Sequence, residues 1–182
     1  MKKIFSKILV VTFIIFLFTG CSCAMNDHTP EEAVETFFEK YRAKDDNVLE
    51  QLKNTIMNED ITDEQKEEYQ KLMEKQYNQL AYVIKNTKKE NDSATVTVEI
   101  TVLDYRSAIN KAEEELKNNP EKFNNDEGNF SEEKYMDYKI EKMKDVTETT
   151  THEIDLILNK DAGMWKVEDL SSDDIMKIHG LY

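Results

Sequence analysis

Beyond residue 28, the first part of the chain places its hydrophobic residues three and four positions apart, the spacing of amphipathic helices. The stretch 29–44 begins Thr-Pro-Glu-Glu, in which the threonine caps a helix, the proline takes its first position and the second glutamate closes a capping box. A second apolar face follows at 48–57, and another capping box starting at Thr62 opens a third helix. We therefore expect three consecutive helices.

The hydrophobic period changes from helical to two after residue 79. The stretch 80–89 places Tyr82 and Ile84 on one face, and 94–106 alternates valine and isoleucine with threonine and glutamate. Between them, residues 90–93 (Glu-Asn-Asp-Ser) have the composition of a turn. This pattern predicts a long antiparallel hairpin with one buried face.

Two more helices are expected before the pattern becomes strand-like again. Ser107 is expected to cap a helix over 107–118. Pro120 either ends this helix or starts a final turn. A polar loop over 124–129 leads to a second helix that begins at Ser131 and runs to residue 144. These helices form a helical pair between two hairpins.

The second hairpin closes the sheet. The stretch 147–159 alternates apolar and polar residues, and the turn 160–163 contains Gly163, where a positive φ costs little. The stretch 164–170 follows with Trp165 on its apolar face, and 172–179 adds one short helical turn. The expected fold class is therefore α+β, with N-terminal helices packed on a four-stranded antiparallel sheet.

At the start of the chain, basic, apolar and small residues follow one another in the order that is typical of an export signal. Three lysines precede an apolar run over 8–18, which is shorter than the roughly 20 residues needed to span a membrane. Thr19 and Gly20 then lead to Cys21. We expect these residues to direct export and not to form a membrane span or a core helix.

The segment Phe18-Thr19-Gly20-Cys21 resembles the bacterial lipobox. The resemblance implies cleavage just before Cys21 and attachment of a diacylglycerol to its sulfur, which would place the protein at the cell membrane, facing the extracytoplasmic side. The domains would be a signal peptide (1–20), a lipidated tether (21–28) and one folded domain (29–182). The usual residue at the first lipobox position is leucine, and the alternative is cleavage after Ala24 by an ordinary signal peptidase.

The net charge and the composition of the chain exclude several classes of partner and ligand. The chain carries 38 acidic and 24 basic residues in 182, a net charge of −14, so nucleic acid is not an expected partner. Cys21 and Cys23 are its only cysteines, which excludes a disulfide framework or a cysteine-based zinc site in the folded part. With four glycines and no matching motif, we expect neither a phosphate-binding loop nor a bound cofactor or metal.

Three stretches together resemble the nuclear transport factor 2-like family, as it occurs in small lipoproteins of Gram-positive bacteria. They are the opening helix 29–44, the hairpin around 96–105, and the closing hairpin 152–170 with its Gly163-x-Trp-Lys-Val ending. The resemblance implies a curved antiparallel sheet wrapped around helices to form a cone with a pocket. Enzymes of this fold place an Asp, His or Tyr inside the cone.

Strand parity marks two candidate pocket residues, Asp104 and His152. Each has a structural alternative, because Asp104 stands at a strand end beside Arg106 and His152 can lie at the sheet rim. No catalytic motif carries over, so we expect a non-catalytic module that binds a small hydrophobic ligand or an envelope protein and is anchored through acyl chains on Cys21. The alternative is a small isomerase- or dehydratase-like enzyme that uses a carboxylate or histidine in the cone.

Overall fold

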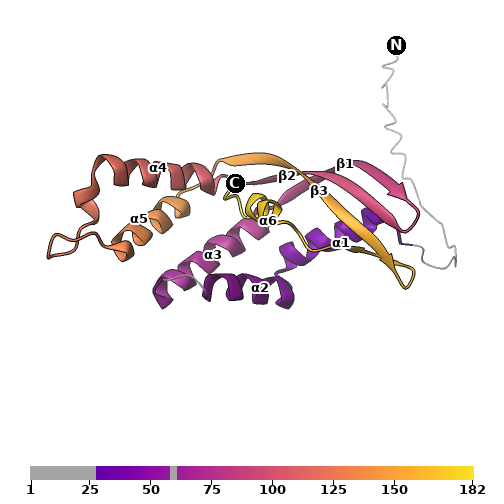
Figure 1. Ribbon diagram of the computed structural model, residues 1–182, viewed down its shortest axis with the longest axis horizontal. Coiled ribbons are helices and arrows are strands. Elements are labelled where there is room, and N and C mark those ends of the chain that lie inside the picture. Colours follow the sequence, from indigo (N-terminus) through magenta and orange to yellow (C-terminus); the bar gives the residue numbers. More distant parts are fainter. Residues whose placement is uncertain (1–27, 58–60) are drawn as a thin grey trace, which may run out of the picture.

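The computed structural model describes residues 28–57 and 61–182, in which six α-helices and a four-stranded antiparallel sheet confirm the predicted α+β class (Figure 1). The three N-terminal helices are α1 (Pro30–Ala43), α2 (Asp46–Met57) and α3 (Asp63–Gln79). Both expected capping boxes are present, at the first turns of α1 and α3. The predicted lipid-attachment residue, Cys21, lies outside the described residues.

The sheet has the order β1-β2-β3-β4, so each strand pairs with its neighbours in sequence. Its strands are β1 (Ala81–Glu90), β2 (Ser93–Leu103), β3 (Thr149–Asp161) and β4 (Met164–Val167). The turn between β3 and β4 has positive φ at both Ala162 (50°) and Gly163 (87°), the geometry of a tight hairpin. Both predicted hairpins are therefore confirmed.

The helices cover one face of the curved sheet, and the other face is open in Figure 1. On the covered face, alternate residues of β2 are completely buried, as are Phe38 of α1 and Met73 of α3. On the open face, Thr97 donates a 2.6 Å hydrogen bond to Asp155 of the neighbouring strand. The covered face of the sheet and the helices thus share one hydrophobic core.

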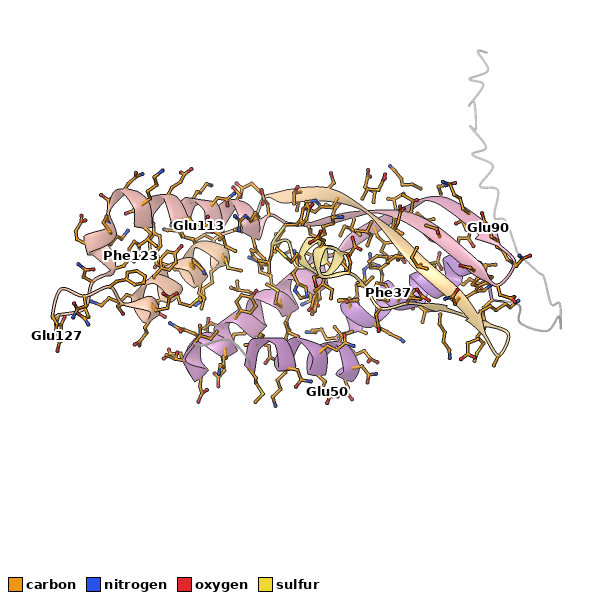
Figure 2. The ribbon with its side chains drawn as sticks, viewed as in Figure 1. Phe37, Glu50, Glu90, Glu113, Phe123 and Glu127 are labelled. Atoms are coloured by element: carbon orange, nitrogen blue, oxygen red, sulfur yellow. The ribbon has the colours of Figure 1, made fainter. Side chains whose placement is uncertain are left out.

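A helical arm extends beyond the sheet between β2 and β3. It comprises α4 (Tyr105–Asn118), the 3-10 turn η1 (Pro120–Phe123) and α5 (Glu132–Lys144), with Phe123 and Glu127 near its tip in Figure 2. The arm has a small hydrophobic cluster of its own, made of Ala112, Phe123, Tyr135, Leu116 and Tyr138. This arm is the predicted helical pair.

The junction between β2 and α4 differs from the prediction. Asp104, not Ser107, caps α4, and its carboxylate accepts a 2.9 Å hydrogen bond from the Ser107 backbone N–H. At Leu103, the last residue of β2, the buried side chain of Gln76 takes the place of a neighbouring strand. Gln76 accepts from the Leu103 N–H at 2.8 Å and donates to the Leu103 carbonyl at 3.2 Å.

The C-terminal segment forms the short helix expected over 172–179 and packs closely against the rest of the domain. Helix α6 (Ser172–Ile178) buries Ile178 completely. The chain then turns at Gly180, whose carbonyl accepts a 2.8 Å hydrogen bond from the Arg106 N–H at the start of α4. This segment ties the arm to the sheet at the end where β2 stops.

Candidate functional site

The main candidate site is a pocket with about 330 Å³ of free volume between the helices, outside the cone. All five helices from α2 to α6 contribute to its walls, and it is referred to below as the helical pocket. Its lining residues are Ile56, Ile61, Tyr69, Arg106, Ile109, Glu113, Met136, Lys139, Ile140, Met143, Met176 and Leu181. A mostly apolar pocket with a few polar groups is typical of small-molecule sites.

The apolar part of the helical pocket combines rigid and adaptable side chains. Ile56, Ile140 and Met143 are at most 4% exposed and belong to the main core. Met136 is partly buried, and Met176 of α6 is 40% exposed. Unbranched methionine side chains can repack around different shapes, so this lining suits an apolar ligand without fixing its outline.

The charged part lies on the arm. The Arg106 guanidinium is 3.7 Å from the Glu113 carboxylate, and their side chains are 41% and 51% exposed. Figure 2 labels Glu113 on α4. The Lys139 ammonium lies 5.3 Å from the centre of the Tyr135 ring. These groups are far more exposed than Met143 and Ile140, which places the charges at the mouth of the pocket and the apolar groups at its base.

A second, shallower groove of about 450 Å³ runs between α1 and β4. Phe37, Trp165 and Val167 supply its apolar residues, and Lys40 and Lys166 are among its charged ones. The Trp165 ring is nearly buried, and its indole N–H has no hydrogen-bond partner among the described residues. Because only two elements build this groove, it encloses a ligand less fully than the helical pocket does.

The two residues predicted for the cone pocket lie near the same end of the sheet but line neither of these sites. Asp104 borders a polar depression between the first turn of α4 and the end of α5, where its carboxylate serves as a helix cap. His152 faces the covered side of the sheet opposite Ile100, as its parity predicted. Whether either residue meets a ligand stays a prediction.

The surroundings of His152 favour its neutral form. Burial lowers the pKa of the imidazole, and the nearby positive charge of Lys177 lowers it further, while Asp104 opposes this shift more weakly. The Nε2 atom is buried without a hydrogen-bond partner among the described residues, and the ring meets the edge of Tyr182 at 5.8 Å between centroids. This imidazole is therefore a weaker base than an exposed histidine.

A buried pair of titratable residues was not foreseen from the sequence. The Tyr77 hydroxyl lies 2.9 Å from Nε2 of His179, which follows α6 directly. Burial lowers the pKa of His179 from 6.5 to about 4 and raises that of Tyr77. The one available signal was the helical spacing of Tyr77 on α3, which predicts its burial but not its partner.

The residues that carry the helical pocket were also not foreseen as a group. Met136, Ile140 and Met143 lie at helical spacing in the sequence of α5, and Ile109 lies on α4. Helical spacing indicates that such residues are covered, but not what covers them. Their convergence with Met176 and Leu181 depends on the C-terminal segment folding back onto the arm.

Within 28–57 and 61–182, no helix is long and apolar enough to cross a membrane. In the same ranges, no three or more histidine, cysteine, aspartate and glutamate side chains gather as a metal site. No family model, no curated protein and no solved structure matches the chain.

Proposed function

We propose that the chain is an exported lipoprotein whose domain, residues 29–182, is a non-catalytic ligand-binding module of the nuclear transport factor 2-like type. Acyl chains on Cys21 would hold it on the extracytoplasmic side of the cell membrane. The order of basic, apolar and small residues before Cys21 supports the anchor. Two acyl chains give stable anchoring where a single chain gives only reversible binding.

The helical pocket is the observation that carries the binding function. The side chains on the covered face of the sheet, such as Val96, Val98 and Ile100, are buried in the main hydrophobic core. The helical pocket instead offers about 330 Å³, within the range of small-molecule sites, and an apolar base with charged groups at its mouth. A small hydrophobic molecule fits this lining better than an extended polar one.

The alternative is a small isomerase- or dehydratase-like enzyme. It requires a titratable side chain that faces the bound substrate. Asp104 and His152 lie outside the helical pocket, and the Asp104 carboxylate is already engaged in capping α4. The placement of these two residues therefore favours binding over catalysis.

The anchor predicts where a cysteine variant will be found. In a Gram-positive host, Cys21→Ala should move most of the protein from the membrane fraction to the medium or leave it unprocessed, because the thioether link cannot form. The matched control is Cys23→Ala, which removes the neighbouring thiol and should leave the protein on the membrane. Immunoblots of cell fractions measure both, and a Cys21→Ala protein that is processed and still membrane-bound contradicts the anchor.

The pocket predicts the loss of probe binding when it is filled. Met136→Trp should weaken binding of an uncharged, environment-sensitive fluorescent dye by about tenfold or more, since the indole occupies the ligand's space, a loss of about 1.4 kcal/mol. The control is Met57→Trp on α2, where the methionine is 59% exposed. Equal dye binding by both variants and the parent protein would show that the dye binds elsewhere and would remove the helical pocket from the proposal.

A further inference from the structure

The charge of the helical pocket is opposite to that of the chain. Its lining contains Arg106 and Lys139 against the single carboxylate of Glu113, whereas the chain as a whole carries −14. The acidic surface of the protein attracts cations, whereas a positively charged pocket on it attracts an anionic group. The local excess of positive charge is therefore the feature of this pocket that selects among ligands.

Both cations are available to a ligand. The Arg106–Glu113 pair is long, at 3.7 Å, and exposed, and pairs of this kind contribute little to stability. Lys139 lies over the Tyr135 ring and pairs with no carboxylate among the described residues. An incoming carboxylate or phosphate can replace Glu113 on the guanidinium, whose planar fork suits such groups, without breaking a strong contact.

The position of these charges sets the orientation of the ligand. Arg106 and Lys139 are on α4 and α5 at the exposed mouth, and the buried Ile140 and Met143 lie at the base. A ligand that satisfies both parts has a charged head and one flexible apolar chain. Met136 and Met176 can adjust to the chain, whereas a rigid polycyclic molecule would make less use of them.

We propose that the helical pocket binds a single-chain amphiphile with an anionic head, a carboxylate or a phosphate, held by Arg106 and Lys139. This proposal rests on the binding function proposed above and adds the chemical class of the ligand. The head lies at the mouth and the chain lies against the apolar base. Glu113 then acts against the ligand and limits its affinity.

The test compares amphiphiles that share a ten-carbon chain and differ in the charge of the head. Decanoate, decanol and decyltrimethylammonium, each below its micelle concentration, compete with the fluorescent dye on the full chain. We expect decanoate to bind about tenfold more tightly than decanol and the ammonium to bind weakest. This preference should shrink as salt is added, because exposed charges are screened.

Variants assign the preference to the named residues. Arg106→Gln and Lys139→Gln should each weaken decanoate binding several-fold and weaken decanol binding much less. Glu113→Gln should tighten decanoate binding, which a structural role alone would not produce. The matched control is Lys117→Gln, an exposed position on the same helix α4, which changes the net charge equally and should have no effect.

The outcomes separate the two proposals. If decanol or the ammonium binds as tightly as decanoate, or if the Arg106 and Lys139 variants keep the preference, the ligand class is wrong and the binding function stands. If no amphiphile of any charge displaces a dye that Met136→Trp weakens, the ligand class is wrong and the binding function stands; if Met136→Trp does not weaken dye binding, both proposals fail. Circular dichroism of each variant confirms that it is folded, and since all four changed side chains are exposed or partly exposed, we expect little change in stability.

Discussion

Replacing Gly180 by alanine should lower the free energy of unfolding by about 3–4 kcal/mol, the combined cost of overpacking and of a left-handed backbone. Gly180 has a φ of +70°, and a Cβ at this position would overlap the Leu103 carbonyl oxygen and Nε2 of Gln76. The carbonyl belongs to the backbone of β2 and is already bound by Gln76. Neither atom can move away without breaking the contacts that end the strand.

The matched control is Gly128→Ala in the loop at the tip of the arm. Gly128 has a similar φ of +82°, but nothing lies within 4 Å of the added Cβ. This variant reports the backbone cost alone, about 1 kcal/mol. Urea unfolding of both variants measures the difference, and equal losses of stability would show that the C-terminal segment does not pack against β2 as described.

The protein should lose stability as the pH falls from about 6.5 to about 4, because His179 is buried as the neutral imidazole. Its folded pKa, about 4, lies below the ordinary value of 6.5, so the unfolded chain takes up the proton first. The stabilisation is therefore complete above pH 6.5 and is lost as the pH approaches 4. The difference between the folded and unfolded pKa values corresponds to an expected loss of about 3 kcal/mol.

A comparison of variants isolates His179 from other acid-sensitive groups. His179→Gln should flatten the dependence of unfolding free energy on pH between 7 and 5, whereas His152→Gln should remove only a smaller part. The low pKa of Glu68, about 2 because of Lys144 and Lys71, contributes only at lower pH. Urea unfolding at several pH values is the measurement, and an unchanged pH dependence in His179→Gln would contradict the proposed burial of the neutral ring.

Short-range sequence patterns were sufficient to predict most of the fold. The capping residues of α1, α3 and α5, the alternation in β2 and β3 and the glycine of the last turn all act within a few residues of their own position. Such signals depend on hydrogen bonds to the nearest backbone groups and on the side-chain period of two, which the sequence displays directly. The parity of His152 followed from the same rule.

The junction at Asp104 could not be predicted in this way. Asp104 and Ser107 are both good capping residues three positions apart, and local preference does not choose between them. Gln76, 27 residues before Leu103, binds both backbone groups where β2 ends. The boundary between strand and helix thus coincides with a tertiary contact that local preferences do not display.

The helical pocket was unpredictable for a related reason. Periodicity shows which side of each helix is apolar. A pocket is the space that remains where the apolar sides of several helices do not pack fully against one another, and periodicity does not show this. Met136, Ile109 and Met176 come from three helices whose relative positions depend on the C-terminal segment. Only the charges of Arg106, Glu113 and Lys139 were visible in the sequence, where they resembled any solvated helix surface.

The helical arm also bears on how the chain reaches its fold. Strands β2 and β3 pair across a long stretch of sequence, with Thr97 and Asp155 separated by 58 residues, and closing so large a loop is slow and entropically costly. The helices α4 and α5 pack on each other through contacts that are close in sequence and can form first. The folded arm then brings Leu103 and Thr149, the residue pair at its base, close together, so that the strands can pair from the arm towards the hairpin turns. The arm is thus a guide for sheet assembly as well as a wall of the pocket.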